Sequence, residues 1–242
     1  MEKTLPILAL DEYCAAKGLP YRTIHRGEPL VVLEHTPPET GARILRRASS
    51  FICCVRDAQV LAYGVLLLEE GLVVHRLSSG DYNGHIQAHL KNYAPGGHFP
   101  SPLPQGGEIE EAVLCWGTEN FGHWIFTYLH RLMLLWHQPE LLKLPLLVKN
   151  TTPSRFLEWL RVMGFTNIVL GADWVKVRKL WVPSVVHYRD EDSKIHLLPE
   201  AVHTFRYLML KERLLPSEKR TRIFISRAKS RWRRLLNENE LI

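Results

Sequence analysis

The 242-residue sequence contains only four cysteines, and their spacing fits neither a metal site nor a disulfide framework. Cys53 and Cys54 are adjacent within an apolar run, whereas Cys14 and Cys115 stand alone. Disulfide-dependent exported domains are much richer in cysteine, and structural zinc sites pair cysteines at short, regular intervals. We therefore expect four reduced thiols in the core of a protein that folds in a reducing compartment.

The sequence also lacks a long apolar run, and we expect no export leader. Its most apolar stretch, residues 121–136, is interrupted by histidine and arginine and falls short of the roughly 18 residues of a membrane span. Residues 1–16 carry Glu2, Lys3, Asp11 and Glu12, which does not fit a signal peptide. We expect a cytoplasmic protein, with peripheral association at the inner face of the membrane left open.

Several widespread catalytic motifs are missing as well. The sequence has no G-x-S-x-G nucleophile elbow, no Walker phosphate loop and no H-E-x-x-H zinc-binding helix. His85 and His89, with His98 nearby, have a spacing that suits a metal on a helix. Surface histidines in a loop are the alternative interpretation, and we expect no metal and no cofactor.

The apolar runs that are present predict an α/β fold in three parts. Residues 1–110 form a β-rich region, with a strand at 30–34 and a meander built from runs 51–55, 60–68 and 72–75. Residues 111–197 alternate strands at 112–116, 144–148, 167–170 and 175–182 with helices at 121–136 and 154–163, which is typical of parallel βαβ units. The second helix should be capped by Thr152, have Pro153 in its first turn and end at Gly164. Residues 198–242 add a linking helix at 198–215 and begin a second domain with a strand at 222–227.

Residues 117–124 and the helix that they open are the first candidate for a site. Asn120 is placed to cap the helix, whose free N–H groups would face a crevice at the end of the preceding strand. At 100° per residue, four polar side chains form one stripe within roughly 100° on an otherwise apolar helix: His123, Thr127, His130 and Arg131. This predicts a mostly buried helix with one narrow open face. The histidines there could orient or deprotonate a hydroxyl group, or simply satisfy hydrogen bonds in the core.

The second candidate is a basic segment near the C-terminus. Residues 211–234 contain ten lysines or arginines against two glutamates, a balance of +8 that exceeds the +6 of the whole chain. Arginine forks beside the predicted strand 222–227 suit the oxygens of a nucleotide diphosphate. A solvated basic surface or an RNA-binding patch is the alternative interpretation.

Both candidates carry a resemblance to one family. Residues 120–132, Asn-Phe-Gly-His-Trp-Ile-Phe-Thr-Tyr-Leu-His-Arg-Leu, resemble the Asn-aromatic-x-His-Trp-Leu…Arg-Leu signature of glycosyltransferase family 61, which includes capsular-polysaccharide transferases. Residues 223–227 and 233–238 are similar to its Ile-Ser-Arg…Arg…Asn-Glu block. The resemblance spans residues 111–241. It departs from the family pattern at Ala228, where a second arginine is usual, and at His130, where many members have proline.

The resemblance implies a GT-B-like architecture: a Rossmann-like N-terminal domain, here preceded by the β meander, and the start of a second Rossmann-like domain. It also implies an inverting, metal-independent transfer of a sugar from a nucleotide-sugar donor to a glycan or polysaccharide acceptor in surface polysaccharide biosynthesis. By this resemblance His123 is the catalytic residue. The acceptor-side residues are Asn120, Thr127, His130 and Arg131, and the donor diphosphate-binding residues are Ser226, Arg227, Arg233, Arg234, Asn237 and Glu238.

Two other functions remain open. One is a non-catalytic remnant that binds carbohydrate or a partner protein, and the other, less expected, is nucleic-acid binding through the basic segment. The pattern breaks off in the first turn of a helix, and the family's remaining C-terminal part is absent. We therefore expect a fragment or a shortened protein in which sugar transfer is weak.

Overall fold

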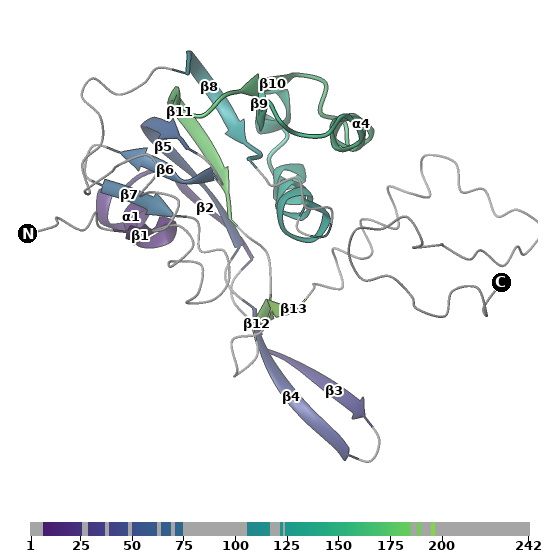
Figure 1. The fold of residues 1–242 in the computed structure, drawn as a ribbon. Coiled ribbons are helices and arrows are strands. Elements are labelled where there is room, and N and C mark those ends of the chain that lie inside the picture. The colour runs from purple at the N-terminus through teal and green to yellow at the C-terminus, as the bar shows by residue number, and fades with distance from the viewer. Residues whose placement is uncertain are drawn as a thin grey trace, which may run out of the picture.

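A computed structural model describes residues 7–25, 29–36, 39–47, 50–61, 64–68, 71–74, 106–116, 122, 124–184, 188–189 and 195–196. Within these residues, nine strands form one mixed sheet and four strands form a second sheet (Figure 1). Helices pack on the large sheet, so the α/β class predicted from the sequence is confirmed. No helix in this part of the chain has the length and apolarity needed to cross a bilayer.

The large sheet brings together strands from widely separated parts of the sequence. Its order is β1 (Ile7–Ala9), β7 (Gly71–Val74), β6 (Leu66–Leu68), β5 (Ser50–Val60), β11 (Val175–Pro183), β8 (Glu108–Leu114), β9 (Leu146–Lys149) and β10 (Ile168–Gly171), and β2 (Tyr21–His25) also pairs with β5. The strand β11 lies at the centre, antiparallel to β5 and parallel to β8. The sheet therefore contains strands from both sides of the domain boundary predicted at residue 110, and the division into domains stays a prediction.

The half of the sheet beyond β5 has the predicted βαβ character. β8, β9 and β10 are parallel neighbours. Three helical segments connect β8 to β9: η3 (Trp124–Leu129), η4 (Leu132–His137) and η5 (Leu141–Lys143). A single α-helix, α4 (Ser154–Val162), connects β9 to β10. The strands predicted at 112–116, 144–148, 167–170 and 175–182 are confirmed with shifts of a few residues at their ends.

Helix α4 begins and ends close to the predicted positions. The prediction that Thr152 is the N-cap is wrong: Pro153 occupies the cap with extended dihedral angles (φ −56°, ψ 141°), and no side chain caps the helix. Proline fixes φ but leaves ψ free, so the residue can precede the helix instead of opening it. Gly164 follows the helix with φ of 98°, the left-handed conformation that glycine adopts most readily.

The β meander forms, but its first strand is longer than predicted. β5 pairs antiparallel with β6, and β6 pairs antiparallel with β7, as expected for two hairpins. The break predicted between the runs 51–55 and 60–68 is wrong, because β5 continues through Arg56 and Asp57. The hairpin to β6 is closed instead by a hydrogen bond from the N–H of Leu61 to the carbonyl oxygen of Val65. The side chains of Arg56 and Asp57 are exposed, and Asp57 has φ of 49°, a conformation that aspartate tolerates better than most residues.

This irregularity extends across the three central strands. Val55 and Ala58 are three residues apart, yet both pack in the same half of the core. Lys179 on β11 is in register with Arg56 on one side and with Glu111 on the other. At the position of Arg56, Lys179 and Glu111, the alternation of inward and outward side chains along the three strands is therefore interrupted. Charged residues occupy this position in place of core residues.

The second sheet has the order β13 (Ile195–His196), β12 (Tyr188–Arg189), β4 (Glu39–Arg47) and β3 (Pro29–Thr36). Its pairings are antiparallel, and β3 and β4 form a long hairpin. In Figure 1 this hairpin projects away from the large sheet. The strand predicted at 30–34 is confirmed as part of β3.

The core lies on both faces of the large sheet. One face of β8 and its neighbours packs against η3–η5 and α4 through residues such as Val113, Cys115 and Trp181. On the other face, α1 (Leu10–Lys17) packs through Leu10 and Cys14. All four cysteines are buried free thiols, as predicted.

Gly106 makes a close backbone contact where β8 and β11 begin. A Cβ atom at this position would lie 2.3 Å from the carbonyl oxygen of Asp173 and 2.9 Å from the backbone nitrogen of Val175. Backbone atoms cannot rotate away as a side chain can. We expect Gly106→Ala to lower the free energy of unfolding by about 1–3 kcal/mol, measured by denaturant titration.

The matched control for this substitution is Glu110→Ala on β8, where the side chain is 83% exposed. A surface change of this kind should alter the free energy of unfolding by no more than about 0.5 kcal/mol. Equal stability of the two variants would contradict the close contact.

Candidate functional site

The buried run that ends β8 leads to the first candidate site. Residues 112–116 are all at most 1% exposed, and the backbone N–H of Cys115 donates to the carbonyl oxygen of Leu147 on β9 at 2.9 Å. Helical structure follows at residues 124–137. A parallel strand that ends in a loop and a helix is the arrangement at which open α/β sheets bind ligands.

The helical segment after β8 differs from the regular α-helix that the sequence predicts. Residues Trp124–Leu129 are π-helical and Leu132–His137 form a 3-10 helix. A π-turn contains one additional residue, which rotates the following side chains by roughly the 100° that one residue spans in an α-helix. The predicted polar stripe is therefore not a straight stripe along one face. Single π-turns within helices occur frequently at functional sites.

Aromatic stacking fixes this irregular segment to its neighbour. The ring of Trp124 stacks on that of Phe156 in α4, with centroids 4.9 Å apart and an interplanar angle of 9°. Tyr128 lies one turn further, with its ring centroid 6.4 Å from that of Trp124. Trp124 and Phe156 are completely buried, so the start of the segment is part of the core.

Two of the predicted acceptor-side residues, His130 and Arg131, are described with their side chains. They are 6% and 1% exposed, so the protein encloses them, in contrast to the open face that we expected. The Nη2 atom of Arg131 donates to the backbone carbonyl oxygen of Trp116 at 2.9 Å. The guanidinium carbon also lies 5.1 Å from the centroid of the Tyr128 ring.

The thiol of Cys115 is within the electrostatic influence of this guanidinium. Burial raises the pKa of the Cys115 thiol to about 12, and the positive charge of Arg131 opposes that rise only in part. The thiol is thus neutral at physiological pH. Cys115 is therefore not an activated nucleophile of the kind that cysteine-dependent enzymes use.

The remaining predicted site residues lie outside the part of the chain that the structure describes. Of the acceptor-side group, these are Asn120 and the catalytic candidate His123, and Thr127 is described only through its backbone. Of the donor group, they are Ser226, Arg227, Arg233, Arg234, Asn237 and Glu238. Their roles stay predictions. The three loop histidines His85, His89 and His98 also lie outside, and the described residues hold no group of three or more side chains that could bind a metal ion.

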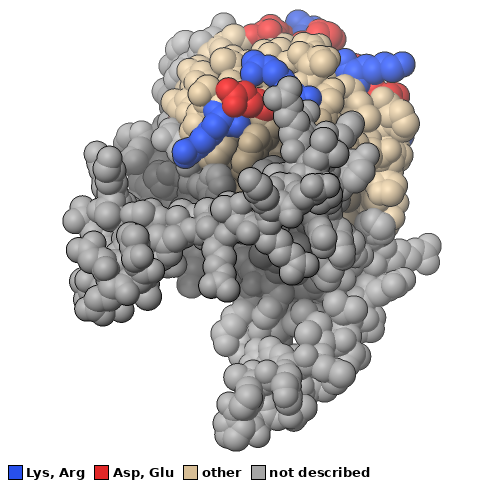
Figure 2. All heavy atoms as spheres, turned by 90° about the vertical axis from the view of Figure 1, so that its right-hand side faces the viewer, with Lys and Arg blue, Asp and Glu red and all other residues tan. Residues whose placement is uncertain are grey.

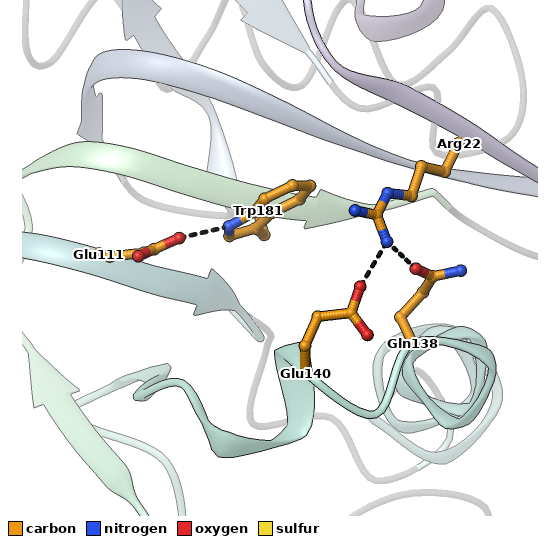
Figure 3. A network of polar contacts seen from close by, with 5 residues as sticks. All are labelled: Arg22, Glu111, Gln138, Glu140 and Trp181. Atoms are coloured by element: carbon orange, nitrogen blue, oxygen red, sulfur yellow. Dashed lines mark hydrogen bonds and ion pairs between the residues drawn. The ribbon is translucent and has the colours of Figure 1, made fainter.

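The structure also contains a polar network that sequence reasoning missed (Figure 3). Arg22 on β2 pairs with Gln138 and Glu140, which lie in the turn after η4. The Arg22 guanidinium lies 5.7 Å from the ring centroid of Trp181 on β11. This network connects the N-terminal region to the helical segment that follows β8.

Trp181 extends the same network to β8. Its indole Nε1 donates to Oε1 of Glu111 at 2.8 Å, and Nζ of Lys179 lies 2.7 Å from the same oxygen. The only sequence signal was the alternation of apolar and basic residues along 175–182 beside an acidic run at 108–111. That signal predicts paired strands without saying which charges meet.

Charges on the described surface are largely paired with one another. Figure 2 shows acidic and basic side chains beside one another on the side of the molecule that it presents. Arg178 lies 2.6 Å from Glu108, and Lys176 lies 3.7 Å from Asp57.

Comparisons with known proteins agree with the motif. The family model described as Glycosyltransferase 61 matches residues 121–242, which is half of the chain. No curated protein and no solved structure matches the chain.

The contact between Lys179 and Glu111 should make stability depend on pH. Hydrogen bonds from Lys179 and Trp181 lower the pKa of Glu111 in the folded protein. Such a carboxylate stabilises the fold above its unfolded pKa of about 4.3 and loses that contribution as the pH falls through the folded pKa. We expect the melting temperature of the wild type to fall more steeply between about pH 5 and pH 3 than that of Glu111→Gln.

Lys179→Met removes the larger cause of the lowered pKa and should flatten the pH dependence in the same way. Carboxylates elsewhere are common to all three proteins, so their effects cancel in the comparison. Melting curves that differ by a constant offset at every pH would show that this contact has no part in the acid sensitivity.

Proposed function

This chain belongs to glycosyltransferase family 61, and from that premise we propose that it transfers a sugar from a nucleotide-sugar donor to a glycan or polysaccharide acceptor. The family match over residues 121–242 is the observation that carries the proposal. It begins at the helical segment after β8, where an open α/β sheet places ligands, and includes the basic segment 211–234.

We propose an inverting reaction without a bound metal. The acceptor hydroxyl oxygen attacks the anomeric carbon while the bond from that carbon to the donor diphosphate breaks. His123 takes the proton of the hydroxyl, and the diphosphate leaves with the bonding electron pair. Arg227, Arg233 and Arg234 would stabilise its charge, since preorganised positive groups can serve a leaving diphosphate in this way. A GT-B-like arrangement, with the acceptor on the first domain and the donor on the second, belongs to the same proposal.

The proposed setting is the cytoplasmic side of the membrane, where nucleotide sugars are used to build surface polysaccharides such as capsule. The excess of basic residues in the C-terminal segment supports peripheral contact with an anionic membrane. Cell fractionation tests this setting: the protein should partition between the soluble and membrane fractions and leave the membrane in high salt.

Binding and transfer separate the roles of the predicted residues. We expect saturable binding of UDP, GDP or dTDP by calorimetry, lost in Arg227→Ala because a phosphate contact is removed. Arg213→Ala is the matched control within the basic segment and should keep the affinity. His123→Ala should bind the nucleotide like the wild type but slow transfer by about 100-fold or more, which is typical for the loss of a general base.

Two outcomes would contradict the proposal. Nucleoside diphosphate binding without transfer to any acceptor would favour the non-catalytic remnant. Affinity for a random oligonucleotide that falls steeply with salt, with no saturable nucleotide binding, would instead identify a nucleic-acid-binding protein.

A further inference from the structure

Among the arginines whose side chains the structure describes, Arg131 alone is almost completely buried, at 1% exposure. Arginine stays charged at any physiological pH, and a buried charge is costly unless it is bound by partner atoms. Nη2 of Arg131 donates to the carbonyl oxygen of Trp116 at 2.9 Å. Cys115 cannot supply a negative charge, because burial raises the pKa of its thiol to about 12. One role of the guanidinium is therefore to bind the backbone at the end of β8.

The residue that Arg131 holds is fixed from several directions. The Trp116 side chain is completely buried against two glycines: a Cβ atom at Gly64 would lie 3.3 Å from its Cβ, and one at Gly171 would lie 3.1 Å from its Cζ3. The adjacent residue, Cys115, is bonded through its N–H to β9. The Trp116 ring and the backbone of Cys115 are thus held by the sheet. The carbonyl group of Trp116 is held by Arg131.

This contact joins the end of β8, just before the family motif, to the last part of that motif. Trp116 immediately precedes residues 117–123, which contain Asn120 and His123, and Arg131 lies near the end of the motif at 120–132. The π-helical residues 124–129 lie between them. Arg131 therefore joins the strand that precedes the catalytic candidate in sequence to the helical residues that follow it.

We propose that Arg131 is a positioning residue for sugar transfer, which binds the Trp116 carbonyl oxygen, so that the end of β8 is fixed to the helical segment that follows, and does not itself contact donor or acceptor. This proposal rests on the proposed function. Misplacement of a reacting group by about 1 Å can cost about 100-fold in rate, so a residue of this kind affects turnover more than binding.

The first test needs no enzymatic activity. Hydrogen–deuterium exchange is compared in wild type, Arg131→Met and Arg131→Lys, with Arg178→Met on the exposed surface of β11 as the control. We expect Arg131→Met to speed exchange in peptides covering residues 112–123 while peptides from β5 keep their protection, which indicates local opening. Arg131→Lys, which keeps one charged donor, should give an intermediate rate, and Arg178→Met should exchange like the wild type.

The second test measures transfer and nucleotide binding with the same variants. We expect Arg131→Met to lower kcat about 100-fold with an unchanged acceptor KM and an unchanged Kd for the nucleoside diphosphate, and Arg131→Lys to recover part of the loss. A rise in KM at constant kcat would show direct substrate contact and overturn the proposal. Faster exchange throughout the sheet would show a purely structural role, and unchanged exchange would show that the carbonyl contact fixes nothing. If the wild type transfers no sugar, the proposed function fails, whereas the exchange data still decide whether Arg131 fixes the end of β8.

Discussion

The pairing of β11 with β5 and β8 is the constraint on which the rest of the large sheet depends. Eight residue pairs join β11 to β5, and the parallel register with β8 occupies its other edge. Without β11 the meander and the βαβ units would be two separate sheets, each with an open edge. Its apolar residues complete both halves of the core, since Trp181 faces the helices while Leu180 and Val182 face α1. β11 also carries Lys179, which lies in register with Arg56 and Glu111 where the alternation of the three strands is interrupted.

This central position has a consequence for the family segment. Residues 121–242 include β11 but neither of its neighbours, because β5 and β8 precede the match. β8 is also the first strand of the βαβ unit that leads to the motif. The sheet at whose end the motif lies is therefore larger than the segment that the family model matches. Arg22, which reaches from β2 to the turn after η4, adds a further contact between the two parts.

What the sequence could predict depends on how local each cause is. The strand at 112–116 and the end of α4 at Gly164 follow from residues adjacent in sequence, and both were predicted. The continuity of β5 through Arg56 and Asp57 follows from its pairing with β11, which local patterns do not contain. The π-turn at 124–129 has no sequence signature either, and it accompanies tertiary contacts, Trp124 with Phe156 and Arg131 with Trp116. Of the site, the family signature supplied the residues, and the assignments of His123 and the donor arginines stay predictions.

A polar stripe on an apolar helix has two physical explanations, and Arg131 illustrates how they differ. Polar side chains can face solvent and ligand, or they can satisfy backbone groups that the fold leaves open. A strand that ends before a loop has a carbonyl group without a ladder partner, and a buried carbonyl of this kind needs a donor. Arginine can supply it from the following helix because its long side chain reaches back along the chain. The enclosed end of the stripe thus has a structural partner in the Trp116 carbonyl group, and the substrate-binding role of His123, nearer the loop in the sequence, stays a prediction.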